Sequence, residues 1–469
     1  MAAGVPSGAN FFSEPPQDVV FEANSSSLIA VSLAHNIGNT LNAGNPLVFQ
    51  LPHVDMSCID FNSSYLKFKL RIVNADGTEI DDAPRGVFPV NGIGHTVWKN
   101  IELLANDVPT TNSYQPYDYK KMIEHLLTAD GCSDNYSELW GFKKRVNVDG
   151  RPAGGEHPIS MLDRDTQRGQ PHFDQDNPDL RNWYEFIVTP ALDLFTCGSN
   201  IVSLDTVKWE LRLTPHENIH ALNWSCNWGN NLEQPNVAGV ADSLNNNYKL
   251  EIESSSVKFY MSTMKLTPSA YSAAIETAQD GGFVYNYTPS VIKVETLNAE
   301  DLNKEVCNFS PRANPVMYAH TFVPHAAYSG NKRYNPYNFS PPPSFTKFYN
   351  FCNGQSLGEE MPVDFRNGGG KAQLYKNNLA ALGIDQHSRG LLYKINEADK
   401  GFWFKVISLV PTSDLLQLAP KTAAGIHSYR VELDNARDIA YTIITYIRYE
   451  DAQLKINLDG TVTNTFAPQ

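Results

Sequence analysis

Residues 65–73 read Tyr-Leu-Lys-Phe-Lys-Leu-Arg-Ile-Val, and this stretch decides the fold class. In an extended chain Leu66, Phe68, Leu70 and Ile72 would point to one side, and the three cations between them would point to the other. Strict alternation of this kind is typical of an antiparallel strand that packs one face on a core and exposes the other to water. We therefore predict a half-buried strand here.

The same two-residue period recurs in three later segments, at residues 207–214, 257–261 and 429–434. Residues 402–410 and 439–449 are more continuously apolar and rich in β-branched side chains. Runs of that composition favour strands that are buried on both faces. The chain therefore contains many strands, of both the half-buried and the fully buried kind.

Helical periodicity is clear in one segment, Pro116 to Ala129, where five apolar residues are spaced at i, i+3, i+4, i+7 and i+8. Pro116 suits the first turn of such a helix. Numerous strands with long connections and only one or two helices predict an all-β fold of sandwiches with Greek-key or jelly-roll wiring.

Long segments with little periodicity separate the strands, at residues 131–181, 223–247 and 326–400. Loops of such length usually carry function or contact a partner. Residues 1–45 are also irregular, and we expect them to form an arm that lies on something else. Two strand-rich halves of comparable length remain, divided near Thr267-Pro268-Ser269.

The composition indicates a folded chain with an acidic surface. A chain of 469 residues is too long for one small domain. With 42% hydrophobic and 19% charged residues, its composition allows a large core. The formal net charge is −14, and the first cation after the N-terminus is Lys67. Because polyanions are repelled by such a balance, we expect no strong direct binding of nucleic acid.

The sequence also favours an intracellular origin. We find neither a signal-peptide pattern nor an apolar stretch long enough to cross a bilayer, so we expect no secretion and no transmembrane segment. The six cysteines are scattered without a Cys-x-x-Cys pair, which is typical of free thiols in a reducing compartment.

Several short segments then follow one another in a telling order: 46–52 (PLVFQLP), 59–61 (IDF), 65–77 (YLKFKLRIVNADG), 90–98 (VNGIGHTVW), 101–107 (IELLAND), 117–127, 334–339 (YNPYNF), 425–433 and 441–456. In this order they resemble the double jelly-roll major capsid proteins of Polinton and adintovirus elements, which belong to the adenovirus-hexon lineage. The resemblance spans nearly the whole chain, although no segment is a catalytic signature.

The resemblance implies two tandem jelly rolls, each an eight-stranded β-sandwich, with a few short helices in long loops. We expect an arm at residues 1–45, jelly roll 1 at 46–267 and jelly roll 2 at 268–469. It further implies a virion protein of a double-stranded DNA virus, made and assembled inside the host cell. Three chains would form a homotrimeric, pseudo-hexagonal capsomer, and capsomers would tile an icosahedral shell together with penton and minor capsid proteins. Such a protein is not an enzyme, so we assign no catalytic, cofactor or metal residues.

One motif favours a different class of protein. The run His216-Glu217-Asn218-Ile219-His220 matches H-E-x-x-H, in which a helix presents two histidines to Zn²⁺ and the glutamate activates water. However, it follows Pro215 directly behind a predicted strand, its continuation has weak helix propensity, and no third ligand can be chosen from spacing. A short turn is the preferred interpretation, and a zinc hydrolase using His216, Glu217 and His220 stays as an alternative.

Two glycine motifs are incomplete. The run from Gly92 to Val97 lacks the third glycine of a dinucleotide fingerprint, and Gly368-Gly369-Gly370-Lys371 lacks two elements of a P-loop. We interpret both as turns. A carbohydrate-binding or carbohydrate-processing sandwich is the other alternative, since aromatic-rich sandwiches with long loops also suit sugars.

Overall fold

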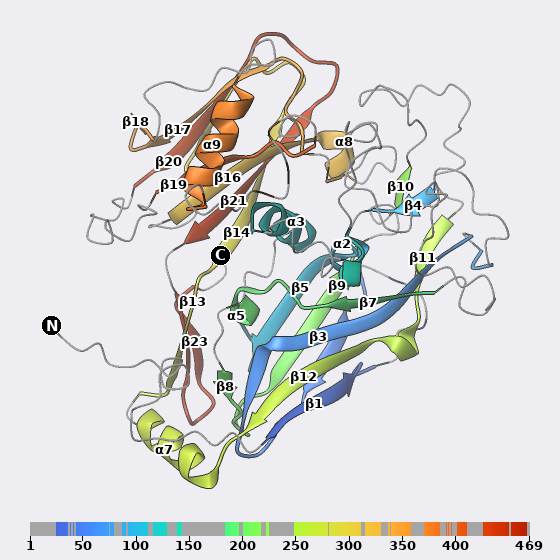
Figure 1. Ribbon diagram of the computed structural model, residues 1–469, viewed down its shortest axis with the longest axis vertical. Coiled ribbons are helices and arrows are strands. Elements are labelled where there is room, and N and C mark those ends of the chain that lie inside the picture. Colours follow the sequence, from blue (N-terminus) through green and yellow to red (C-terminus); the bar gives the residue numbers. More distant parts are fainter. Residues whose placement is uncertain are drawn as a thin grey trace.

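The structure is a computed structural model that describes residues 25–35, 38, 41, 44–74, 76–78, 87–90, 92–110, 116–128, 138–142, 183–196, 200–216, 222–224, 248–279, 281–310, 315–329, 336–337, 339–357, 370–384, 391, 393, 395, 401–409, 425–449 and 452–466. Within these ranges antiparallel sheets dominate, and the helices are short (Figure 1).

The first sandwich is built around the long strand that contains the alternating stretch. Its larger sheet consists of β1 (Ser25–Ser32), β12 (Lys258–Lys265), β3 (Ser57–Asn74) and β11 (Tyr248–Ile252), with β7 (Tyr184–Val188) and β8 (Asn200–Val202) also paired to β3. The facing sheet consists of β2 (Leu47–Leu51), β9 (Trp209–Pro215), β5 (Trp98–Ala105) and β6 (Val108–Pro109). Aromatic rings fill the space between them, with Phe68 of β3 5.3 Å from Trp98 of β5 between ring centroids.

The second sandwich repeats this plan with later strands. One sheet orders β14 (Ser290–Leu297), β21 (Tyr441–Tyr449), β16 (Pro315–Pro324) and β19 (Lys405–Ser408), and the other orders β15 (Asn303–Cys307), β20 (His427–Leu433), β17 (Phe345–Cys352) and β18 (Gln355–Ser356). Between them the ring of His320 lies 4.7 Å from Phe348. The Nδ1 atom of His320 contacts Thr445 Oγ1 at 3.0 Å, and its Nε2 accepts a hydrogen bond from the Asn350 amide at 2.7 Å.

A third, smaller sheet connects the two sandwiches. It orders β13 (Phe283–Tyr287), β22 (Ala452–Ile456) and β23 (Val462–Asn464). The Tyr285 hydroxyl accepts a hydrogen bond from the Val202 amide, and the Asn464 side chain donates to the Pro109 carbonyl. The last strands of the chain therefore lie against the first sandwich. A short pair of strands, β4 (Val87–Pro89) and β10 (Leu222–Trp224), stands apart from these sheets.

Short helices fill the junctions and edges. They are α2 (Ile93–Thr96), α3 (Tyr117–Thr128), α5 (Asp193–Thr196), α7 (Pro268–Ala278), α8 (His325–Tyr328) and α9 (Lys371–Ala381), with 3₁₀ turns η1 (Glu138–Trp140) and η4 (Ser254–Ser256). Figure 1 shows α3 between the two sandwiches. No helix in the described ranges is both long and apolar enough to cross a membrane.

The strands and the helix expected from periodicity are confirmed. The four alternating stretches lie in β3, β9, β12 and β20, and the helix expected at Pro116–Ala129 is α3. In β21, within the expected doubly buried run 439–449, every residue except Arg448 is buried.

The expectation of a largely irregular segment at 326–400 was wrong in part, because β17, β18, α8 and α9 lie there. In β17 the polar Asn350 points into the core while Tyr349 and Phe351 are only half-buried, and the register shifts between Phe345 and Lys347. Both features break the apolar alternation by which a strand is recognised.

Two further elements lie where the sequence predicted neither a strand nor a helix. Ser25–Ser32, within the expected arm, forms the edge strand β1 and pairs with β12. Helix α7 begins at the expected division of the halves, where the Thr267 hydroxyl accepts a hydrogen bond from the Ala270 amide and Pro268 occupies the first turn. This is a common helix start.

Candidate functional site at the junction of the sandwiches

Helix α3 is the element that places polar side chains between the two sandwiches. Its apolar residues Met122, Ile123 and Leu126 are completely buried. Lys120 and Glu124 are four residues apart, so they share a face of the helix. Lys120 contacts Asp193, which in turn contacts β14 of the second sandwich. Glu124 contacts β14 and β21 directly.

Lys120 forms a buried ion pair at the junction. Its Nζ lies 2.6 Å from Asp193 Oδ1, and the two side chains are only 7% and 8% exposed. Asp193, at the start of α5, also accepts hydrogen bonds from the Ser290 amide at 3.2 Å and the Ser290 hydroxyl at 2.8 Å. Burial alone would lower the pKa of Lys120, but attraction to Asp193 and Glu124 outweighs it and the pKa is raised.

Glu124 extends this network to the sheet of the second sandwich. The Tyr446 hydroxyl of β21 donates to Glu124 Oε1 at 3.1 Å, and Ser290 Oγ of β14 lies 3.4 Å from the same atom. Burial raises the pKa of Glu124, although Lys120 opposes that shift. Residues of α3, α5, β14 and β21 are thus joined in one polar network.

A second polar contact of α3 involves the first residue of the H-E-x-x-H motif. Asp118 is completely buried and accepts a hydrogen bond from the Tyr337 hydroxyl at 2.7 Å. The Nε2 atom of His216, at the end of β9, lies 3.2 Å from the same Asp118 oxygen. Glu217 and His220 lie outside the described residues, among which no three histidine, cysteine or acidic side chains gather as metal ligands. In the structure His216 therefore lies beside the Asp118 carboxylate.

The first glycine motif forms a single helical turn, α2, rather than the expected simple turn. Gly92 has φ +70°, and a Cβ atom there would lie 2.5 Å from Trp140. A Cβ atom on Gly94 would lie 2.9 Å from the Trp140 carbonyl oxygen. These glycines therefore allow α2 to pack closely on η1, which is a structural role. In the second motif Gly370, at φ +76°, directly precedes α9, and Gly368 and Gly369 lie outside the described residues.

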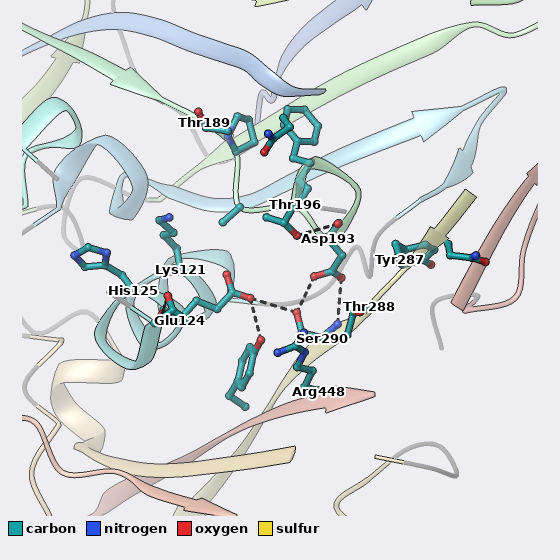
Figure 2. Close-up of a pocket in the computed structure, with 18 residues that line it drawn as sticks. Lys121, Glu124, His125, Thr189, Asp193, Thr196, Tyr287, Thr288, Ser290 and Arg448 are labelled. Atoms are coloured by element: carbon teal, nitrogen blue, oxygen red, sulfur yellow. Dashed lines mark hydrogen bonds between the residues drawn. The ribbon is translucent and has the colours of Figure 1, made fainter. Parts of the chain in front are cut away.

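A cavity of about 600 Å³ opens beside this network. Figure 2 shows Lys121, Glu124 and His125 reaching it from α3, with Asp193 and Ser290 hydrogen-bonded across from them. The further lining includes side chains of both sandwiches and of their connections: Asn62, Thr189, Thr196, Asn286, Thr288 and Arg448.

The sequence did not reveal this junction. Lys120 and Glu124 are four residues apart in a helix that the sequence predicts. Nothing near them in the chain indicates a partner at Asp193, 73 positions from Lys120, or at Tyr446, 322 positions from Glu124. The one local signal was a set of charged residues, Asp118, Lys120, Lys121 and Glu124, in a helix that also buries apolar side chains.

Comparisons with known proteins identify the fold. No family model matches the sequence, and no curated protein matches it. Among solved structures, the chain is similar to the Sputnik virophage structure determined by cryo-EM, with a TM-score of 0.56, 10% identity, and 97% of this chain and 91% of that chain covered.

Two further solved structures are similar over comparable lengths. The Faustovirus major capsid protein has a TM-score of 0.55 and 10% identity over 92% of this chain and 90% of that chain. PBCV-1 VP54, fitted into a reconstruction of the virophage Sputnik, has a TM-score of 0.51 and 10% identity over 96% and 98%. The expected fold class, all-β with two tandem jelly rolls, is confirmed.

Proposed function

We propose that this chain is a viral major capsid protein, whose copies assemble into an icosahedral shell around a double-stranded DNA genome. The observation that carries the proposal is the two-sandwich fold, which is similar to capsid proteins over more than nine-tenths of the chain. Fold likeness alone does not assign function, since one fold can serve several. The ordered segment resemblance to double jelly-roll capsid proteins supports the same role independently.

The proposed unit of assembly is a homotrimer with a pseudo-hexagonal outline, because three copies of two similar sandwiches supply six comparable blocks. Closed rings of identical chains use heterologous contacts between unlike surfaces. The outer face of the second sandwich offers features found at such contacts. There Arg430 lies over the rings of Tyr349 and Phe351, at 4.9 and 5.7 Å, on a half-buried surface. Aromatic residues and arginine are enriched at interface centres.

The finer proposals concern organisation and partners. We propose jelly roll 1 at 46–267, jelly roll 2 at 268–469, and an arm at 1–45 that reaches beneath or across neighbouring subunits, with its strand β1 added to the edge of the larger sheet of the first sandwich. We further propose a protein of the Polinton or adintovirus type that is not an enzyme. It would be assembled inside the host cell and would contact penton and minor capsid proteins in the virion.

The oligomeric state tests the proposal. In sedimentation velocity the purified full chain should behave as a particle of about three times its 52.2 kDa mass. Negative-stain images of the same sample should show hexagonal outlines. A chain that stays monomeric across a wide range of protein concentrations would contradict the capsomer.

A further inference from the structure

We propose that the cavity at the sandwich junction binds a small oxyanion, a phosphate or polycarboxylate, through Lys121 and Arg448. The proposal concerns the lining of this cavity of about 600 Å³. It does not depend on the capsid role, because a junction between two sandwiches of one chain exists in the monomer as well as in an assembly.

The carboxylates that line the cavity already have partners inside the chain. Asp193 accepts from Lys120 and from Ser290, and Glu124 accepts from Tyr446. A cation entering the cavity would have to displace these donors. A cationic ligand is therefore disfavoured.

The cationic groups that line the cavity are not satisfied in this way. Arg448 is the exposed residue of β21, and among the described residues its guanidinium forms neither an ion pair nor a hydrogen bond. Lys121 also lacks an ion pair within the described ranges, and its ammonium lies 5.6 Å from the Trp140 ring centroid. Asn62 and Thr189 add neutral donor groups to the same lining.

The charge balance at the cavity points the same way. Lys121 and Arg448 place two cationic groups in the lining, and Asp193 and Glu124 place two carboxylates there. Asp193 is already paired with Lys120, which lies outside the lining. Burial lowers the pKa of His125 to about 3, so its ring is neutral near pH 7. One positive charge is therefore left over, and an oxyanion with several acceptor atoms would neutralise it.

The desolvation of Lys121 adds a further reason. Burial lowers the pKa of this ammonium more than Glu124 raises it. A bound anion beside Lys121 would favour its protonated form and reverse that shift.

Isothermal titration calorimetry of the purified full chain tests the proposal, with pyrophosphate and citrate as separate probes. We expect saturable binding of one anion per chain, with affinity at least tenfold lower in Arg448→Gln and in Lys121→Gln. Binding of only one of the two probes would identify the chemical source of the anion.

Matched controls separate the cavity from general ionic attraction. Lys258→Gln removes a half-buried lysine of β12 outside the cavity lining and should leave the affinity unchanged. Arg448→Lys keeps the charge and should retain part of the binding, and circular dichroism verifies that each variant folds. Absence of saturable binding for both probes, or equal affinity in all variants, would overturn the proposal. Neither result would affect the oligomeric state, which tests the proposed function separately.

Discussion

Lys120 and Asp193 form a buried ion pair in which each charge compensates the other. With Asp193→Ala, the Lys120 ammonium stays 7% exposed and loses its nearest counter-charge. Breaking a buried pair from one side costs about 3–5 kcal/mol of unfolding free energy, because an uncompensated charge is left in the interior. We expect a loss of this size in urea denaturation followed by intrinsic fluorescence.

Two variants control that experiment. Glu185→Ala removes a carboxylate that pairs with Lys67 at 2.9 Å on the surface. The Glu185 side chain is 42% exposed and the Lys67 side chain 34%. Exposed pairs contribute about 0–1 kcal/mol, so this variant should be nearly neutral. The double variant Lys120→Met/Asp193→Ala should recover much of the loss. A loss for Asp193→Ala no larger than for Glu185→Ala would show that the pair is not stabilising.

His125 should make stability depend on pH. Its ring packs edge-on against Trp140 and Phe142, at 4.8 and 4.5 Å between centroids, and burial lowers its pKa from 6.5 to about 3. Between these two values the unfolded chain binds a proton that the folded chain does not. The free energy of unfolding therefore falls as the pH decreases from about 6.5 towards 3.

The variant His125→Leu isolates this contribution. Between pH 6.5 and 4 its unfolding free energy should decline less steeply than that of the unsubstituted protein. The difference in slope should correspond to about one bound proton. Buried His95, His320 and His427, whose pKa values burial also lowers, would contribute to the remaining decline. Parallel pH profiles for the two proteins, measured by urea denaturation, would refute the assignment to His125.

The packing of α2 on η1 depends on a glycine that two constraints require. Gly92 has a left-handed φ of +70°, and a Cβ atom there would lie 2.5 Å from the Trp140 ring. Gly354, in the β17–β18 turn, has φ +78° with no atom within 4 Å of its Cβ position. Gly92→Ala combines strain with overpacking and should cost about 2–4 kcal/mol, whereas Gly354→Ala should cost about 1 kcal/mol. Equal shifts in denaturation midpoint would show that η1 moves aside without cost.

Elements were predictable from sequence where one periodicity ran without interruption. Within β3 the buried side chains Leu66, Phe68 and Leu70 alternate regularly, and α3 buries apolar side chains at helical spacing, so residue spacing alone identified both elements. Strand β17 was missed because Asn350 faces the core, where it binds His320, and a register shift interrupts the alternation. The polar residue at position 350 is explained by a hydrogen bond to a distant strand, which the local sequence pattern does not reveal.

The junction could not be predicted for a related reason. Lys120, Asp193 and Ser290 are each ordinary polar residues in the sequence, and their contact depends on how two sandwiches sit on α3. The fold class follows from many local regularities, each of which is visible alone. The site follows from a few contacts between distant segments, which are visible only in three dimensions.

At the scale of the whole molecule, the small sheet of β13, β22 and β23 ties the end of the chain to the first sandwich. Asn106, between β5 and β6, donates from its side-chain amide to the carbonyl oxygens of Thr206 and Gly460. The Thr206 hydroxyl donates to the Leu458 carbonyl. Contacts between segments that are far apart in the chain favour cooperative unfolding, because the small sheet cannot unfold without breaking its hydrogen bonds to the first sandwich.

The charge of the whole chain predicts how the isolated protein behaves towards DNA. With a net charge of −14 it should release few counterions from a phosphate backbone, so binding should be weak and nearly independent of salt. Fluorescence anisotropy of a labelled duplex, titrated with purified protein at about 50 and 200 mM salt, measures this directly. The same chain extended by eight N-terminal lysines serves as a positive control, and its binding should fall steeply with salt. Tight binding by the unextended chain, with a comparable salt dependence, would show that a local basic surface outweighs the net charge. If binding is weak, as we expect, condensation of a genome inside the shell would require other basic proteins or counterions.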